Sequence, residues 1–261
     1  MEFIDAHSHY NDEQFEDDIE EVIKRTFDGG ITKVICAGYD IPSSKLSIEI
    51  SKKYDFIYSK CGISPNDVPE DKNKIDDMLK EIEELAKNDK VVAIGEIGLD
   101  YHWNTENKEI QKEMFIKQIE IANKYDLPIQ IHTREAVMDT IQILKDNPVK
   151  KRGMFHCCPL NRELIKEALK LDFYISFAGP VTFKNSKNAE EIVQMVPLNR
   201  LIIETDSPYL SPEPKRGTRN ECLNVKYTAE KISLFKGITI DEVANQTYSN
   251  VLELFGKISK N

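Results

Sequence analysis

Eight short runs of apolar and β-branched residues alternate with longer helical patterns from one end of the chain to the other. Apolar side chains occupy both faces of each run, as in strands buried within a parallel sheet. The runs lie near residues 2–7, 32–38, 55–63, 90–99, 127–132, 152–157, 172–179 and 200–206. We therefore expect eight buried strands that are connected by helices.

The segments between these runs carry apolar residues at helical spacing, with charged residues on the opposite face. In the segment 71–90, for example, Ile75, Leu79, Ile82 and Ala86 follow this spacing. Strands that alternate with such helices favour a parallel sheet. Further helical patterns lie near 14–28, 42–54, 107–126, 134–147, 160–171, 186–196, 221–236 and 239–256.

Eight strand–helix units in 261 residues favour an α/β fold of the (β/α)8 TIM-type barrel class over an open, doubly wound sheet. A hydrophobic content of 40% is enough for a large core. No linker or low-complexity tract divides the chain, so we expect a single domain over residues 1–261. The open sheet stays an alternative, because strand order cannot be read from one sequence. The glycine signatures of nucleotide-binding folds, G-x-G-x-x-G and G-x-x-x-x-G-K, are absent.

The net charge of −10 argues against a protein that coats nucleic acid by bulk attraction, since phosphate binding usually requires a basic surface. It leaves open an enzyme that meets phosphate through metal ions in a local pocket. The five cysteines form no C-x-x-C pair, which argues against a disulfide framework and a structural zinc site. No apolar run approaches the roughly 20 residues of a membrane span, and no signal peptide is evident. We expect a cytoplasmic protein with no membrane contact and no obligate protein partner.

Four of the five histidines lie at or just beyond the carboxyl ends of expected strands. Two carboxylates share this placement, one near the end of the fourth expected strand and one at the end of the eighth. In a barrel the carboxyl ends of all strands converge on one mouth, where residues distant in sequence meet. The six residues that we expect to meet there are His7, His9, Glu96, His132, His156 and Asp206.

The pair His7 and His9 has the spacing of metal ligands, because positions i and i+2 of a strand share a face with Cα atoms about 6.5 Å apart. An isolated H-x-H pair arises more often by chance than as part of a metal site. The prediction therefore depends on the histidines and carboxylates at the other strand ends. Glu96 lies inside an apolar run, where a buried carboxylate needs a cation or a proton. A carboxylate can also bridge two divalent ions about 3.5–4 Å apart. The expected ligands then divide into His7, His9 and Asp206 around one ion and His132 and His156 around the other, with Glu96 between them.

Two further carboxylates have open roles. Asp5 shares a strand face with His7 and could hold a ligand in place as a hydrogen-bond acceptor. Glu204 would share a face with Asp206 in a straight strand, and it is either such a partner or an ordinary ion-pair residue. Asp206 itself could bind metal and accept a proton from a metal-bound water.

Three residues are candidates for contact with substrate. His102 lies beside Tyr101 and Trp103 after the fourth expected strand, Arg134 follows the fifth strand's histidine, and Arg219 lies in a basic loop. Arg134 could bind a phosphate bidentately. The alternatives are an ordinary exposed side chain for His102, an ion pair at a helix start for Arg134 and a solvated loop for Arg219.

With these residues in place, the chain resembles the TatD family of metal-dependent hydrolases, within the amidohydrolase-like barrels. The motifs "IDAHSH", "GEIGLDYHW", "PIQIHTREA", "FHC" and "ETDSPYL" carry the resemblance over nearly the whole chain. It implies a TIM-type barrel, a divalent-metal site and DNase activity, typically exonucleolytic with 3′-to-5′ polarity. By motif position, the six residues listed above match the family's metal ligands. The chain departs from the family's pattern at Cys157-Cys158-Pro159 and at Cys222, which affects substrate loops and leaves the ligands intact.

These observations predict a metal-dependent phosphodiester hydrolase that acts on DNA, with single strands or 3′ ends favoured. One or two divalent cations, Mg²⁺, Mn²⁺ or Zn²⁺, would lower the pKa of a bound water. Asp206 and Glu96 are the expected catalytic carboxylates, with Asp206 as the proton acceptor. An amide or ester hydrolase on the same site is the alternative. A non-catalytic metal-binding scaffold is a third hypothesis, and the intact Glu96 and Asp206 argue against it.

Overall fold

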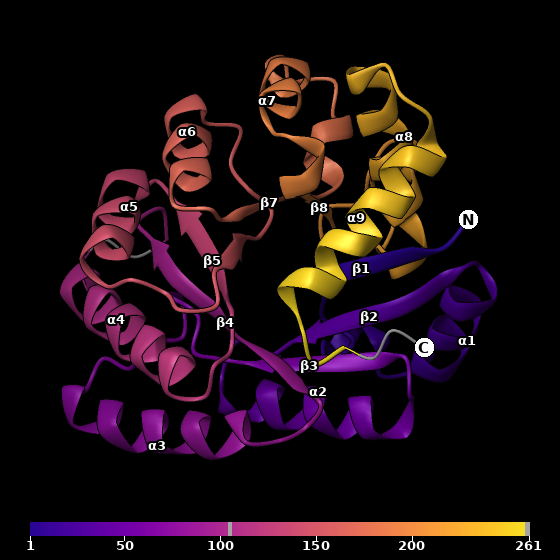
Figure 1. Ribbon diagram of the computed structural model, residues 1–261. Helices are drawn as coiled ribbons and strands as arrows, with labels where there is room; N and C mark the ends of the chain where they lie inside the picture. Colours follow the sequence, from indigo (N-terminus) through magenta and orange to yellow (C-terminus); the bar gives the residue numbers. More distant parts are fainter. Residues whose placement is uncertain (104–105, 259–261) are drawn as a thin grey trace.

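Eight parallel strands form one barrel in which the strand order follows the sequence (Figure 1). The computed structural model describes residues 1–103 and 106–258. A parallel bridge between Ser8 and Ser207 joins the segment after the last strand to the first strand. The expected (β/α)8 barrel is therefore confirmed, and the open-sheet alternative is wrong. The strands are β1 (Phe3–Ser8), β2 (Ile31–Ala37), β3 (Ile57–Cys61), β4 (Val91–Asp100), β5 (Ile129–Arg134), β6 (Gly153–Phe155), β7 (Tyr174–Phe177) and β8 (Leu201–Ile203).

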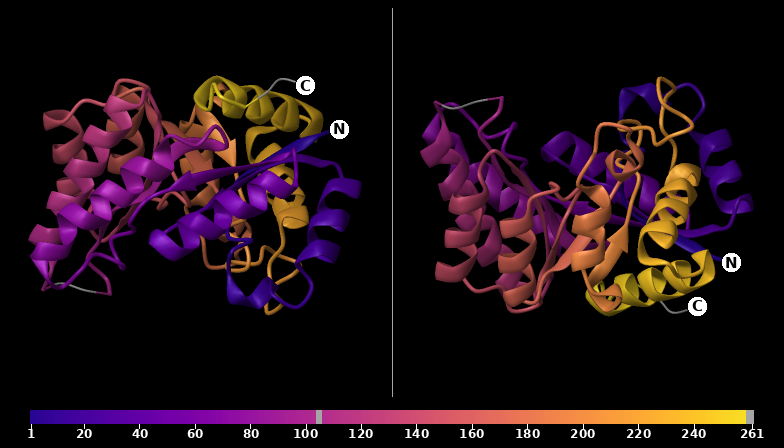
Figure 2. Two further views of the ribbon diagram at one scale, coloured as in Figure 1. Left: turned by 90° about the horizontal axis from the view of Figure 1, so that it is seen from below. Right: turned by 90° about the horizontal axis from the view of Figure 1, so that it is seen from above.

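Helices surround the barrel on its outside (Figure 2). Their apolar faces are buried against the strands, as Leu79, Ile82 and Ala86 are in α3. Local capping fixes where some of them begin; Asp40 accepts a hydrogen bond of 2.7 Å from the backbone N–H of Ser43 at the start of α2. The helices are α1 (Ile19–Asp28), α2 (Ile41–Lys53), α3 (Ile75–Ala86), α4 (Lys108–Lys124), α5 (Val137–Asp146), α6 (Arg162–Lys170), α7 (Ala189–Met195), α8 (Val225–Lys236) and α9 (Ile240–Leu254).

The last helix, α9, packs against β1 and β8 and covers the end of the barrel seen in Figure 1. Val251 and Phe255 belong to a buried cluster that also contains Ile4 and Val92, which lie near the amino ends of β1 and β4. The amino-terminal end of the barrel is therefore filled with apolar side chains. The carboxyl ends of the strands lie at the opposite end, where polar residues are placed.

Several helices begin at least three residues later than expected, among them α7 at Ala189 and α8 at Val225. The helix expected at 14–28 starts at Ile19 and is preceded by a short 3-10 helix, Glu13–Phe15. The helix expected at 134–147 starts at Val137, because Arg134 still pairs with β4 as the last residue of β5. Arg134 is thus placed by a strand and not by a helix start.

The eighth strand is shorter than expected at its carboxyl end. It ends at Ile203, although the apolar pattern extends to Asp206. The φ of Asp206 is 59°, a left-handed conformation that an extended strand does not contain. The backbone N–H of Asp206 instead donates to the carbonyl of His7 over 2.9 Å, which ties the segment after β8 to β1.

No helix within residues 1–103 and 106–258 is long and apolar enough to cross a membrane. All five cysteines lie in these ranges and carry free thiols. Cys36 and Cys61 are fully buried in β2 and β3, where they act as small apolar side chains.

Candidate metal centre

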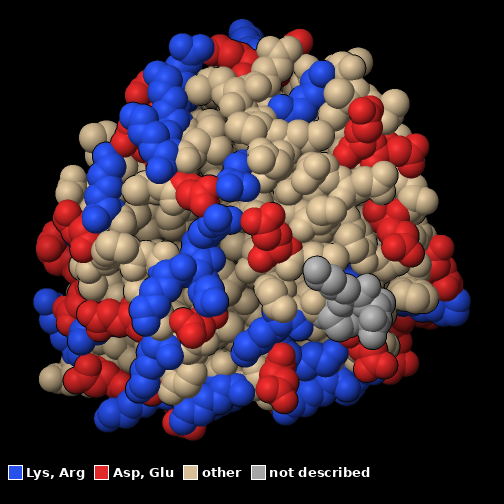
Figure 3. Space-filling model, viewed as in Figure 1, with Lys and Arg blue, Asp and Glu red and all other residues tan. Residues whose placement is uncertain are grey.

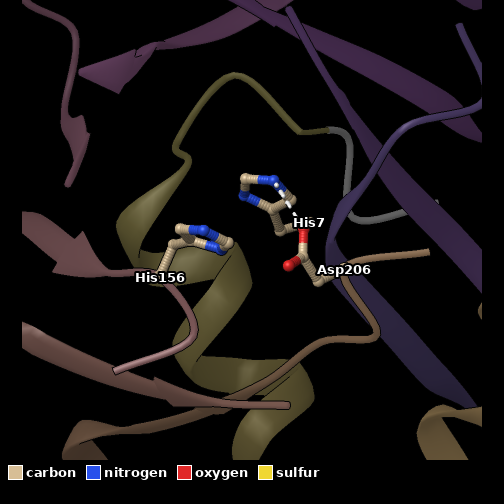
Figure 4. A group of neighbouring side chains, drawn as sticks. All are labelled: His7, His156 and Asp206. Carbon is tan, nitrogen blue, oxygen red and sulfur yellow. Dashed lines mark ion pairs between the residues drawn. The ribbon is translucent and has the colours of Figure 1, made fainter. Parts of the chain in front are cut away.

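The six residues expected at the mouth lie together in the structure. Three are in strands (His7 in β1, Glu96 in β4 and His132 in β5), and three lie just beyond strand ends (His9 after β1, His156 after β6 and Asp206 after β8). Figure 4 shows His7 and His156 face to face with Asp206 beside them, and their ring centroids are 3.8 Å apart.

Asp206 contacts both histidines of the H-x-H pair. Its Oδ1 lies 3.4 Å from Nε2 of His7 and 3.3 Å from Nε2 of His9. The two Nε2 atoms are themselves only 2.9 Å apart. Two ring nitrogens and a carboxylate oxygen are thus close together. The groups of residues that could hold one ion nevertheless combine them differently from the expected division, with His156 beside His7 and Asp206, and Glu96 beside His7 and His9.

Glu96 lies between these residues and the other two histidines. Its Oε2 is 3.6 Å from Nε2 of His7, whereas its Oε1 is 3.0 Å from Nδ1 of His132 and 3.7 Å from Nε2 of His156. Only 8% of Glu96 is exposed. The two oxygens of one buried carboxylate therefore face different histidines, as a bridging ligand requires.

Hydrogen bonds orient the two histidines of the first strand. Nδ1 of His7 lies 2.6 Å from Oε1 of Gln130, and Nδ1 of His9 lies 3.1 Å from the carbonyl oxygen of Ala37. For His9, the acceptor beside Nδ1 favours a proton on that nitrogen and leaves Nε2 with a free electron pair. For His7, Nδ1 lies beside both Gln130 and the Nζ of Lys60. In both residues, Nε2 is the nitrogen that faces Asp206.

Carboxylates orient the other two histidines. Nδ1 of His156 lies 2.8 Å from Oε1 of Glu204, and Nε2 of His132 lies 2.9 Å from Oδ2 of Asp100. The opposite ring nitrogen of each histidine faces Glu96. All four imidazoles thus present one nitrogen to a protein acceptor and the other to the centre, which is how metal-binding histidines are held.

Glu204 is a partner of His156 rather than an ordinary surface ion-pair residue. It is fully buried, its Oε1 accepts a hydrogen bond of 2.6 Å from the backbone N–H of Cys157, and its Oε2 accepts one of 2.7 Å from Ser176. Because β8 ends at Ile203, Glu204 does not follow the straight strand on which it would share a face with Asp206.

Asp5 is a hydrogen-bond acceptor for His7, as expected, but through the backbone of His7 and not through its ring. Its Oδ1 accepts hydrogen bonds from the backbone N–H groups of His7 and Thr205, at 3.2 and 2.9 Å, and its Oδ2 accepts one from the Thr205 hydroxyl at 2.5 Å. The carboxylate therefore holds β1 to the segment after β8. Asp5 thus holds His7 in place through its backbone, whereas Gln130 orients the imidazole of His7.

Lys60 in β3 is a charged neighbour that the sequence reasoning missed. It is fully buried, and its Nζ lies 2.9 Å from Nδ1 of His7. No carboxylate of the described residues lies within ion-pair distance of this Nζ. Burial lowers the pKa of Lys60 to about 7. The available signal was a lysine inside the apolar run "DFIYSKCGI", since lysine is almost never fully buried.

The histidines and carboxylates of the centre shift one another's pKa values. Burial alone would lower the pKa of His132, but its hydrogen bonds to Asp100 and Glu96 raise that pKa to about 10. Burial alone would raise the pKa of Glu96, but the charge of His156 and the hydrogen bond from His132 hold it well below its usual range. The carboxylate of Glu96 is therefore ionised at neutral pH.

Gly98 allows β4 and β5 to approach at the centre. Its φ is +138°, and a Cβ there would lie 2.0 Å from the carbonyl oxygen of His132. A side chain at Gly95 would likewise lie 2.8 Å from the Cβ of Gln130. Both glycines thus serve the close packing of β4 against β5.

The three residues expected to contact substrate are placed differently from one another. His102 is partly exposed, and its Nδ1 lies 2.7 Å from Glu135. Arg134 is exposed and forms no ion pair with any described residue, so the helix-start alternative does not hold for it. Arg219 is held by Asp18 through bonds of 2.6 and 2.8 Å, so it lies in an ion pair rather than free in a solvated loop.

Comparison with known proteins places this geometry in a family. Residues 4–256 match the family model described as TatD related DNase. The uncharacterized metal-dependent hydrolase YabD of Bacillus subtilis is 44% identical over 252 residues, which cover 96% of this chain and 98% of YabD. The uncharacterized metal-dependent hydrolase YcfH of Escherichia coli is 34% identical, with 98% of this chain and 96% of YcfH covered.

Solved structures share the fold over nearly the whole chain. The crystal structure of YJJV, a TatD homolog from Escherichia coli, superimposes with a TM-score of 0.91 at 24% identity and covers 97% of this chain and 98% of its own. A TatD family hydrolase from Entamoeba histolytica gives a TM-score of 0.86 at 26% identity, with 98% of both chains covered. The chain belongs to the TatD-related DNase family of metal-dependent hydrolases.

Proposed function

We propose that this protein hydrolyses phosphodiester bonds in DNA, with one or two divalent cations held by six residues. These ligands are His7, His9, Glu96, His132, His156 and Asp206. The observation that carries the proposal is the position of Glu96, whose two carboxylate oxygens face histidines on either side of it. The family match to TatD related DNases supports DNA as the substrate.

The residues present fit a divalent cation. Three groups have potential ligand atoms within 4.8 Å of one another, and they share the imidazole nitrogens and carboxylate oxygens that suit Zn²⁺ or Mn²⁺. The groups are His7, His9 and Glu96; His7, His156 and Asp206; and Glu96, His132 and His156. When bound there, such ions would lower the pKa of a coordinated water and offset the charge on the phosphoryl oxygens.

Asp206 is suited to take the proton from the attacking water. Its backbone is fixed by the hydrogen bond to the carbonyl of His7, and its side chain is 14% exposed. Its Oδ2 accepts no hydrogen bond from any residue that the structure describes, so this atom is open to water. A carboxylate in this position acts as a general base.

The charge of the chain agrees with binding of DNA through cations held at the mouth rather than through a basic surface. The chain has a net charge of −10, and Figure 3 shows basic side chains lying among acidic ones on the face that carries α9. That face is the amino-terminal end of the barrel, opposite the mouth. Because the chain as a whole is acidic, attraction of a phosphate to the mouth would depend on bound cations.

The test is incubation of the purified protein with end-labelled single-stranded DNA and separate additions of Mg²⁺, Mn²⁺ and Zn²⁺. Asp206→Asn and Glu96→Ala should abolish nucleotide release, whereas Asp146→Asn, which changes an exposed carboxylate in α5, should not. Comparison of 5′- and 3′-labelled strands tests the proposed 3′-to-5′ polarity. Equal release by the wild type and both site variants would indicate a contaminating nuclease. Turnover of a panel of esters and amides without DNA cleavage would overturn the proposal in favour of the second hypothesis.

A further inference from the structure

Trp103 is a large aromatic side chain that lies on the surface at the mouth. It is 70% exposed and is the only tryptophan in the chain. Its aromatic contact is the edge of His102, with ring centroids 4.8 Å apart and planes at 84°. Single exposed apolar residues are common, so exposure alone does not assign a role to this ring. A second observation supports a role for Trp103: hydrogen bonds connect its turn to the candidate metal centre.

One carboxylate connects Trp103 to the centre. Asp100, the last residue of β4, is fully buried and places Oδ2 2.9 Å from Nε2 of His132. Its other oxygen, Oδ1, accepts hydrogen bonds from the backbone N–H groups of His102 at 2.9 Å and Trp103 at 3.3 Å. The turn that presents the indole is therefore fixed by the same side chain that orients His132.

A cationic group lies over the indole. The guanidinium carbon of Arg134 is 5.3 Å from the ring centroid of Trp103, and Arg134 follows His132 by two residues on β5. A hydrogen bond of 2.9 Å from the backbone N–H of Tyr101 to the carbonyl of Arg134 ties the two segments together. The guanidinium is exposed and forms no ion pair within the described residues, so its donors are available to an anion.

We propose that Trp103 and Arg134 form a subsite for one unpaired nucleotide, in which the base stacks on the indole and the guanidinium binds the adjoining phosphate. The inference rests on the proposed nuclease function and adds the residues that would hold one nucleotide of the substrate. Aromatic side chains bind bases of any sequence by stacking, and arginine binds phosphate with paired N–H donors. A base within a duplex is already stacked, so this subsite selects single strands and frayed ends.

The emission of Trp103 tests the subsite directly, because no other tryptophan contributes to it. The metal-loaded protein is mixed with short oligodeoxyadenylate in a stopped-flow fluorimeter and followed before turnover. We expect a saturable loss of emission with this strand. An abasic oligonucleotide of the same length and charge should cause none. No loss, or an equal loss with the abasic strand, would overturn the proposal.

Kinetics of hydrolysis give a second readout. Trp103→Ala should lower kcat/KM for oligodeoxyadenylate by about tenfold, mainly through KM, and Trp103→Phe should restore most of the loss. The ratio of kcat/KM on oligodeoxyadenylate to kcat/KM on the abasic strand should therefore fall in Trp103→Ala and recover in Trp103→Phe. Leu234→Ala removes a side chain that is 71% exposed on α8, and it should have no effect on either strand.

The two proposals fail in different ways. Equal kcat/KM of Trp103→Ala and the wild type on oligodeoxyadenylate would overturn the subsite and leave the nuclease function standing. Absence of DNA hydrolysis by the wild type would overturn the nuclease function, and the emission measurement would still decide the subsite.

Discussion

Oε1 of Glu204 lies 2.8 Å from Nδ1 of His156, and this contact directs the opposite ring nitrogen of His156 toward Glu96. Both side chains are buried, so the contact is not screened by solvent. A carboxylate beside one nitrogen keeps the proton there and increases the basicity of the other. Glu204 is thus a positioning residue for His156, which is a proposed metal ligand. Glu204 itself is not proposed to bind the metal.

Glu204→Gln should weaken metal binding by about 10- to 100-fold, because the neutral amide orients His156 less strongly and increases its basicity less. The measurement is competition for Zn²⁺ or Mn²⁺ with a chromophoric chelator. Glu190→Gln removes an exposed carboxylate from α7 and should leave the affinity unchanged. Wild-type affinity in a natively folded Glu204→Gln protein would show that the contact does not act on the metal.

Lys60→Met should strengthen metal binding by about tenfold or more, since it removes a buried positive charge near a proposed ligand. Nζ of Lys60 is 2.9 Å from His7, and its charged form opposes a cation at Nε2 of that ring. The same chelator competition measures the change. Lys53→Met, at the exposed end of α2, controls for the change in net charge. An affinity equal to or weaker than that of the wild type would contradict the electrostatic argument.

His7→Ala and His132→Ala should differ in how much metal they lose. His7 belongs to two of the three groups of potential ligands, whereas His132 belongs to one. We therefore expect His7→Ala to lower metal content more than His132→Ala does, because both groups that contain His7 stay complete in His132→Ala. Elemental analysis by mass spectrometry after dialysis gives the ions per chain. Unchanged metal content in His7→Ala would refute its assignment as a ligand.

The strands and the six polar residues of the centre could be predicted because both depend on local patterns. Apolar runs mark buried strands, and a barrel brings all carboxyl strand ends to one place, so strand-end histidines and carboxylates converge without knowledge of side-chain angles. Asp206 was expected at the end of a strand that in fact stops at Ile203, and it still lies at the centre because the segment after β8 turns back toward β1.

The residues that orient the ligands could not be predicted in the same way. Gln130 lies two positions before His132 on β5, yet it contacts His7 on β1, across the barrel interior. That contact depends on how the strands are staggered when the barrel closes, which one strand's sequence does not contain. Asp5 is a similar case, since its position on the ligand face does not show that it contacts the backbone N–H groups of His7 and Thr205 rather than an imidazole.

Glu221→Gln should lower the free energy of unfolding by about 1 kcal/mol at pH 7, and the difference should vanish in acid. The side chain of Glu221 lies 2.6 Å from Arg25, and this hydrogen bond holds the pKa of Glu221 below its usual value of 4.5. A carboxyl group whose pKa is lower in the folded state stabilises the fold above its unfolded pKa, and the stabilisation is lost as pH falls through the folded pKa. The difference between the two proteins should therefore be constant from neutral pH down to about pH 5.5 and shrink below about pH 4.5.

Urea denaturation at several pH values measures this difference in the free energy of unfolding, with Glu190→Gln as the control for an exposed carboxylate. A difference that persists undiminished in acid would mean that Glu221 stabilises the fold by packing rather than by its charge.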